Sequence, residues 1–215
     1  MSSATPYAIM LVVCASVATT WYGLRADLPS RFKPKQPAPT VQVSSEDYTR
    51  RQPGRPLFAG LSSYASLDQV RREFSAKKLE PEHRLMTPPP DPRYPVHAID
   101  TLTLQHYPLL GTHGRLTLQF FNDRLFEVGY KPDDAAACAR ALKGALPQLR
   151  RDANGRAEHI SGSQRVASNV DLAASSVGQS LNTEPYVIWQ DLRLIRERDD
   201  WDQRFGSLPY DSAGD

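Results

Sequence analysis

Alternation of hydrophobic and polar residues predicts a β-sheet in the middle of the chain. Leu102, Leu104 and His106 fall on one side of a first strand, and polar residues separate them. Residues 114–130 continue the alternation, and their apolar positions are Leu116, Leu118, Phe120, Phe126, Val128 and Tyr130. This pattern predicts two further strands joined as a hairpin.

The turn of this hairpin decides which side chains share a face. A two-residue turn at residues 122–123 would put the two apolar sets on different faces. A three-residue turn at residues 122–124 would instead pair Phe120 with Phe126. Because the apolar residues must be buried together, we predict the three-residue turn.

Helix signals occur at three places. Ser66 and Gln69 have the spacing of a capping box ahead of an apolar stripe. Residues 131–134, Lys-Pro-Asp-Asp, suit the first turn of a second helix, and residues 196–205 form a short final one. Residues 81–95 are rich in proline and predict a loop.

Two later strands are predicted at residues 165–172 and 187–195. The expected order is helix, three strands, helix, two strands, helix. This order predicts an α+β domain in which helices pack on one face of an antiparallel sheet.

The N-terminal segment has a different composition. Residues 7–24 contain no charged residue, and this run is long enough for a transmembrane helix. We expect an uncleaved anchor, and a cleaved signal peptide or a lipoprotein are the alternatives. By the positive-inside rule, the basic residues after the span favour a cytoplasmic location for the rest of the chain. The linker and the folded domain, in contrast, look like those of an envelope protein and favour the periplasm.

We expect four segments: an anchor at 1–24, a proline-rich basic linker at 25–56, an α+β domain at 57–205 and a flexible tail at 206–215. The linker has seven Lys or Arg against three Asp or Glu, so it carries +4. Because the chain carries +2 and residues 1–24 are uncharged, the rest carries −2. A slightly acidic domain argues against a nucleic-acid partner.

The chain shows no strong catalytic or metal motif. The spacings of its five histidines match no compact ligand motif, so we expect no metal and no cofactor. Cys138 falls on the predicted buried side of a helix, where a thiol is inert. The acidic pairs 133–134 and 199–200 are expected to cap helices.

Binding residues are predicted in the last strand. Trp189, Asp191 and Arg193 alternate on one side, and Asn169 and Asp171 join them if the two late strands pair. Tryptophan and arginine are favoured at protein interfaces. We therefore interpret this side as a candidate protein-binding surface.

A helix of pattern S-x-x-x-V-x-x-x-F followed by a hairpin of pattern G-x-L-x-L-x-F-x-N-D-x-L resembles a bacterial envelope fold. The fold is shared by small outer-membrane assembly lipoproteins and β-lactamase-inhibitor-like proteins. Its residues here are Ser66, Val70, Phe74, Gly114, Leu116, Leu118, Phe120, Asn122, Asp123 and Leu125. The resemblance implies an envelope protein that binds other proteins, and it carries over no functional residue.

The sequence therefore predicts a module of the bacterial inner membrane, anchored through residues 7–24, that binds an envelope protein without catalysis. One alternative is an enzyme whose site combines His106, Asp171 and Asp191 across the sheet. Another is an accessory subunit of a membrane complex.

Overall fold

The computed structural model describes residues 45–58, 60–87 and 93–206. The chain divides into two compact units, Met1–Gln42 and Val43–Asp215, and every described residue belongs to the second. The expected anchor, the linker up to residue 44 and the tail from 207 lie outside the described residues. Within the described part, no helix has the length and apolar character needed to span a membrane.

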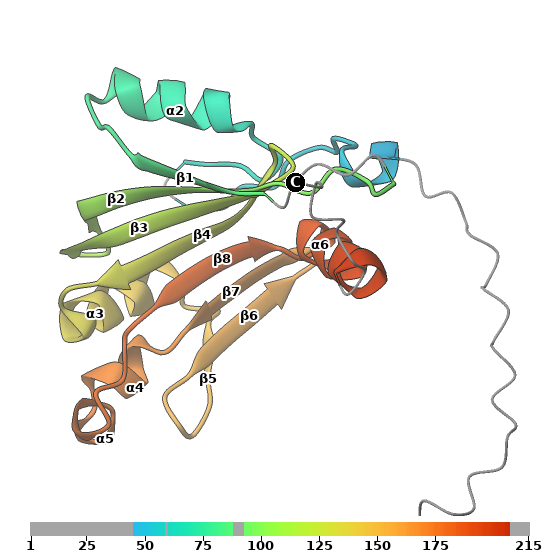
Figure 1. Ribbon diagram of the computed structural model, residues 1–215. Helices are drawn as coiled ribbons and strands as arrows, with labels where there is room; N and C mark the ends of the chain where they lie inside the picture. The colour runs from blue at the N-terminus through green and yellow to red at the C-terminus, as the bar shows by residue number, and fades with distance from the viewer. Residues whose placement is uncertain (1–44, 59, 88–92, 207–215) are drawn as a thin grey trace, which may run out of the picture. The chain divides into compact units, whose positions relative to one another are not determined.

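Eight strands of the described chain form one antiparallel sheet, which confirms the predicted α+β class (Figure 1). Their order across the sheet is β1-β2-β3-β4-β8-β7-β6-β5. The strands are β1 Glu82–Met86, β2 Ile99–Leu109, β3 Thr112–Phe121, β4 Leu125–Pro132, β5 Arg150–Arg151, β6 Ala157–Ser161, β7 Gln164–Ser168 and β8 Val187–Asp191. The helices are η1 Ser45–Tyr48, α2 Leu67–Ala76, α3 Ala135–Ala145, α4 Val170–Ala174, α5 Ser176–Ser180 and α6 Leu192–Phe205.

The strand order has an internal symmetry. Helix α2 precedes β1–β4 and helix α3 precedes β5–β8, so each half of the sheet consists of four strands that come after one helix in the sequence. The last strands of the two halves, β4 and β8, pair at the centre, and the first strands, β1 and β5, form the two edges. The sheet therefore consists of two halves with the same order of helix and strands.

Helices α2 and α3 cover one face of the sheet. Ser66 caps α2 by accepting a hydrogen bond from Gln69 N, and Asp134 caps α3 through Ala137 N, as the sequence predicts. Their buried side chains join the main core with alternate strand residues: Val70, Phe74, Cys138, Leu142, Leu102, Leu104, Leu116, Leu118 and Val128. This core follows directly from the period-two pattern of the strands.

Helix α6 packs on the opposite face, so the expectation that all helices lie on one face is wrong. Phe120 belongs to the main core, and Phe121 belongs to a second cluster with Leu194 and Trp201 of α6. Consecutive strand residues point to opposite faces, which places α6 across the sheet from α2 and α3. Figure 1 shows α6 at the end of the sheet, where it follows β8 directly.

The β3–β4 hairpin combines a two-residue turn with a β-bulge. Asn122 and Asp123 both have positive φ, 49° and 60°, as a type I′ turn requires. The register shifts beyond Leu125, which pairs with Phe120. Phe126 is the extra residue of the bulge and joins the second cluster.

The predicted three-residue turn is therefore wrong, although the pairs further along the strands are correct. Leu118 pairs with Val128 and Leu116 with Tyr130, because one bulge residue restores the register that the shorter turn would lose. The Phe120–Phe126 pair does not form.

Several other predicted features differ in the structure. The proline-rich segment 81–95 contains the edge strand β1, and the late strands end early because helices begin at residues 170 and 192. His106, expected on the apolar face, lies in a bulge of β2 with φ 51° and a largely exposed side chain. The pair at 199–200 lies inside α6 instead of capping it.

Candidate functional site

The predicted binding side of the last strand is buried. Trp189 is 4% exposed, and its ring stacks on Phe58 at 4.1 Å between ring centroids. Asp191 is fully buried as the last residue of β8, and Arg193 already belongs to α6. The expectation of one exposed strand face is wrong here, because the chain that enters the domain covers this side and the strand stops at the helix cap.

Asn169 and Asp171 hold loops in place. Asn169 is buried, and its side chain donates to Glu184 O at 2.9 Å and accepts from Tyr186 N at 2.7 Å. Asp171 pairs with Arg151 and, at 3.5 Å, with Lys143. The five predicted residues therefore do not form one surface.

The buried carboxylate of Asp191 forms an ion pair with Arg193, whose side chain is partly exposed. Its carboxylate accepts from Arg193 Nε at 3.0 Å and Nη2 at 2.6 Å, and from Ser63 Oγ at 2.7 Å. Burial alone raises the pKa of Asp191, but the hydrogen bonds from Arg193 and Ser63 outweigh it and bring the pKa below its ordinary value. The carboxylate is therefore charged and holds the first turn of α6.

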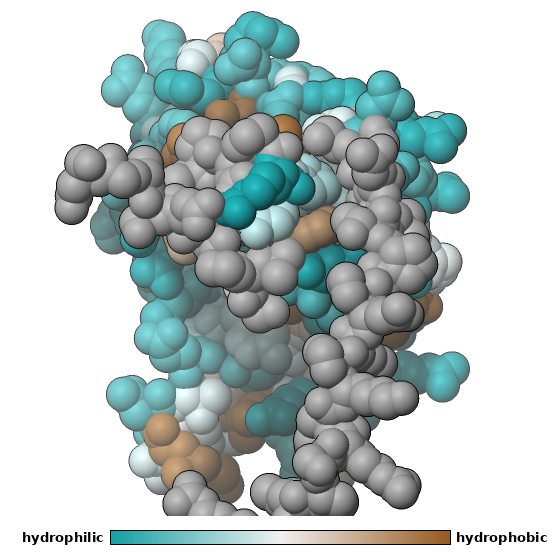
Figure 2. Space-filling view, turned by 45° about the vertical axis from the view of Figure 1, so that its right-hand side comes forward, coloured by the Kyte–Doolittle hydropathy of each residue, from teal (hydrophilic) through white to brown (hydrophobic). Residues whose placement is uncertain are grey.

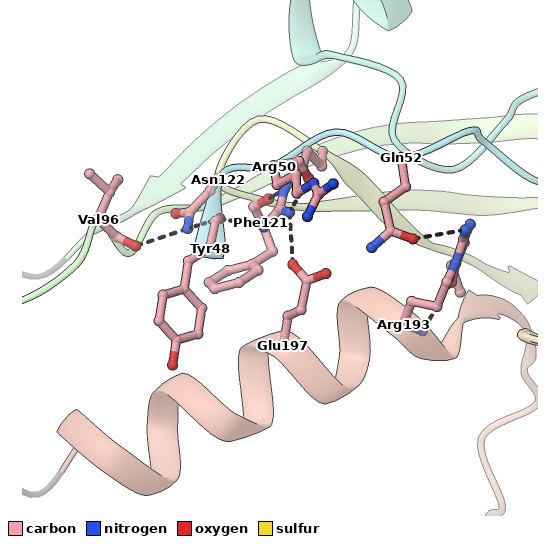
Figure 3. A network of polar contacts seen from close by, with 10 residues as sticks. Tyr48, Arg50, Gln52, Val96, Phe121, Asn122, Arg193 and Glu197 are labelled. Carbon is pink, nitrogen blue, oxygen red and sulfur yellow. Dashed lines mark hydrogen bonds and ion pairs between the residues drawn. The ribbon is translucent and has the colours of Figure 1, made fainter. Parts of the chain in front are cut away.

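Arg193 also binds the segment by which the chain enters the domain. We call residues 48–64 the strap. Arg193 donates to Gln52 Oε1 at 3.2 Å and to Pro53 O at 3.1 Å (Figure 3). The end of the predicted linker is thus part of the folded unit.

Arg124 anchors the same strap from the β3–β4 turn. Its side chain is fully buried and donates to Tyr48 O at 2.5 Å, Arg50 O at 2.9 Å and Glu197 Oε2 at 2.7 Å. Asn122 adds a bond to Tyr48 O at 2.9 Å (Figure 3). The turn therefore joins the strap to α6.

Tyr64 lies between the two arginines. The centre of its ring is 5.8 Å from Arg124 Cζ and 4.9 Å from Arg193 Cζ, which is cation–π geometry. Its φ of 62° is rare for a bulky residue, and its buried hydroxyl has no hydrogen-bond partner among the described residues. Burial raises its pKa to about 12, so the phenol is neutral.

The alternative catalytic residues do not meet. Asp191 bonds with Ser63 and Arg193, Asp171 pairs with Arg151 and Lys143, and His106 approaches Asp133, so the three share no partner; these contacts are set by different elements. Cys138 is buried in the core, and burial raises its pKa to about 12. Across the described ranges, no group of three or more His, Cys, Asp or Glu is placed to hold a metal ion.

A different surface carries a connected set of polar side chains. We define the open face as the side of the sheet opposite α2 and α3, without the part that α6 covers. One row of residues across it consists of Thr117, Gly129, Ile188 and Ala167. These positions are cross-strand partners in the register, so they share one side of the sheet. Their places were not evident from the sequence, because the pairing of β4 with β8 joins residues about 60 positions apart.

A ladder of side-chain hydrogen bonds crosses the open face next to this row. Gln119 Nε2 donates to Glu127 Oε1 at 2.9 Å, and Gln190 Nε2 donates to Glu127 Oε2 at 2.5 Å. Arg165 then donates to Gln190 Oε1 at 2.8 Å and to Glu158 Oε1 at 2.6 Å. The ladder joins five strands, β3, β4, β8, β7 and β6, and its hydrogen bonds hold these side chains in fixed positions.

Two hollows lie on the open face. The first has a volume of about 260 Å³, and its lining includes Arg115, Thr117, Lys131, Glu184, Tyr186 and Ile188. The second has a volume of about 320 Å³, and its lining includes Arg150, Asp152, Arg156, Glu158, Arg165 and Tyr186. Tyr186 lines both, and it is 38% exposed.

These hollows and the ladder form a polar surface. Figure 2 shows one side of the molecule, and the described residues visible there are mainly hydrophilic, with hydrophobic residues in small separate groups. Neither a protein-family model nor a curated protein matches the chain.

Proposed function

We propose that this chain is a membrane-tethered module of the bacterial cell envelope that binds a partner protein through the open face of its sheet. The observation that carries the proposal is the open face itself, with its ordered side-chain ladder and two neighbouring hollows. A surface whose side chains are already ordered loses less conformational entropy when it binds. The partner's contacts are then mainly polar.

The tether is the uncharged run of residues 7–24 followed by the proline-rich linker. A run of this length suits a single transmembrane helix in the inner membrane. We place the domain on the periplasmic side, in line with the resemblance to envelope proteins. The basic residues 25–35 favour the opposite orientation, so sidedness needs its own experiment.

Site-specific photocrosslinking in cells tests the binding surface. A photoreactive amino acid replaces Ile188 or Thr117 on the open face, and Arg72 on α2 serves as the matched control on the other face. We expect one defined protein adduct from both open-face positions and none from position 72. The same adducts from all three positions, or no adduct at 188 and 117, would contradict the proposal.

A reporter that is active only after export, fused after residue 215, tests the orientation. We expect activity in the periplasm. Activity of a matched cytoplasmic reporter alone would place the domain on the other side of the membrane and remove the periplasmic assignment.

A further inference from the structure

Basic side chains gather around Tyr186 on the open face. Arg115 and Lys131 line the first hollow, and Arg150, Arg156 and Arg165 line the second. They belong to two stretches of the sequence, 115–131 in β3 and β4 and 150–165 in β5, the loop before β6, and β7, and the fold brings these stretches to one surface.

Some of these charges are already neutralised. Lys131 pairs with Glu184, and Arg165 pairs with Glu158 at 2.6 Å. The carboxylate of Asp152, the remaining acid in the second hollow, accepts two backbone hydrogen bonds from its own loop, each 2.9 Å long. The acids of the two hollows therefore already have partners.

Arg150 and Arg156 are the unpaired cations of the second hollow. Both are exposed, and within the described part of the chain neither guanidinium has a hydrogen bond or an ion pair. Arg150 lies opposite Glu158 in the sheet, but Glu158 Oε1 accepts a hydrogen bond from Arg165 Nε. Two guanidinium groups at one hollow thus retain their full capacity to donate hydrogen bonds.

This combination selects a particular kind of partner. A guanidinium group binds a carboxylate through two parallel hydrogen bonds, which favours Asp and Glu side chains. Tyrosine and arginine are, with tryptophan, the residues enriched at the energetic centres of protein interfaces. A hollow of about 320 Å³ admits side chains of a segment lying across the sheet but no folded domain.

We propose that the second hollow binds an acidic segment of the partner protein. Arg150 and Arg156 contact its carboxylates, and the ring of Tyr186 packs against the same segment. This inference rests on the proposed function, that the open face binds a protein.

Fluorescence anisotropy with the full chain in a neutral detergent tests it. The probe is a labelled synthetic peptide of alternating Glu, Asp and Gly, and the matched control peptide has Gln and Asn in place of the acids. We expect the acidic peptide to bind and to weaken as salt is added, because screening reduces exposed charge pairs. Equal binding of the two peptides would overturn the inference.

Two double variants then locate the site. Arg150→Glu with Arg156→Glu reverses the charge of the hollow, and Arg71→Glu with Arg72→Glu makes the same change on α2. We expect the first to weaken acidic-peptide binding by at least ~30-fold, the effect of losing a strong interface residue, and the second by less than ~2-fold. Equal losses in both variants would show a non-specific charge effect and overturn the inference.

The outcome separates this inference from the proposed function. The crosslinker at position 188 is placed in the unchanged chain and in the Arg150→Glu, Arg156→Glu chain. If both chains capture the same partner equally well in cells, the acidic-segment inference fails and the open face remains a binding surface. If no open-face position captures a protein, the proposed function fails. Stronger binding to vesicles with anionic lipid than to the peptide, dependent on the same arginines, would overturn the inference in favour of a membrane contact.

Discussion

At the scale of single residues, Arg124 and Asp191 fix the strap to the domain. Arg124 is fully buried in a turn, where three oxygen acceptors from the strap and α6 surround its guanidinium. Asp191 is equally buried and holds Arg193, which in turn binds the strap. Removing one member of such a set leaves the others buried without partners, which costs more than the original pair contributes.

Replacing Arg124 with methionine tests this role. Arg124→Met leaves Glu197 without the bond from its cation, Arg50 O without a donor and Tyr48 O with only the bond from Asn122. We therefore expect a loss of ~3–5 kcal/mol in the free energy of unfolding. Denaturant titration followed by tryptophan fluorescence measures it. Arg72→Met on α2 is the control and should change stability by less than ~0.5 kcal/mol. A loss below ~1 kcal/mol for Arg124→Met would mean that water replaces its contacts.

Asp191 predicts an acid-dependent loss of stability. Its folded-state pKa lies below the unfolded value of ~3.9, so its contribution is complete above that pH and disappears as the pH falls through the folded-state pKa. We expect Asp191→Asn to be less stable at pH 7 and to lose less stability on acidification. Denaturant midpoints between pH 2.5 and pH 7 measure this difference. Parallel curves for both proteins would contradict the assignment.

At the scale of elements, β3 and β4 contribute side chains to the hydrophobic clusters on both faces of the sheet. Their inner residues form the main core, and Phe121 and Phe126 reach the second cluster under α6. The type I′ turn and the bulge together make this possible, because the extra residue turns Phe126 toward α6 while Leu118 and Val128 remain paired. The hairpin thus connects the two hydrophobic clusters.

Two glycines of this hairpin make a matched pair for mutation. A Cβ atom on Gly114 would lie 2.3 Å from Lys131 O, whereas on Gly129 its nearest contact would be Thr117 O at 3.8 Å. We expect Gly114→Ala to lower the unfolding free energy by ~1–3 kcal/mol and Gly129→Ala to change it by less than ~0.5 kcal/mol. Thermal and denaturant unfolding of both variants measure the difference. Equal stabilities would show that the strand ends move apart easily.

At the scale of the whole molecule, the strap makes the end of the linker part of the domain. Tyr48 is buried, and its carbonyl accepts from both Asn122 and Arg124. The compact unit accordingly begins at Val43.

Truncation tests where the folded unit begins. A chain that starts at residue 43 keeps the strap, so we expect it to unfold at the same denaturant concentration as the full chain. A chain that starts at residue 57 loses the acceptors at Tyr48, Arg50 and Pro53, and we expect a loss of at least ~2 kcal/mol. Urea titrations of the two chains measure this. Equal midpoints would show that the strap contributes nothing to the domain.

The sequence by itself determined the features that depend on neighbouring residues. Ser66 and Asp134 start helices through bonds to backbone groups three residues away, and the alternation of Leu102, Leu104, Leu116 and Leu118 defines the core side of the strands. These signals are local, because a cap or a pleat involves only a few adjacent positions. The antiparallel α+β class follows from them.

Only the tertiary structure decided which side chains are buried and which form a surface. Trp189 and Asp191 look in sequence like part of an exposed strand face, but Phe58 and Ser63 of the strap cover them from more than 120 positions away. Phe126 continues the apolar alternation, yet α6 draws it to the other face. The open face likewise arises because β4 meets β8, and no local pattern encodes that long-range pairing.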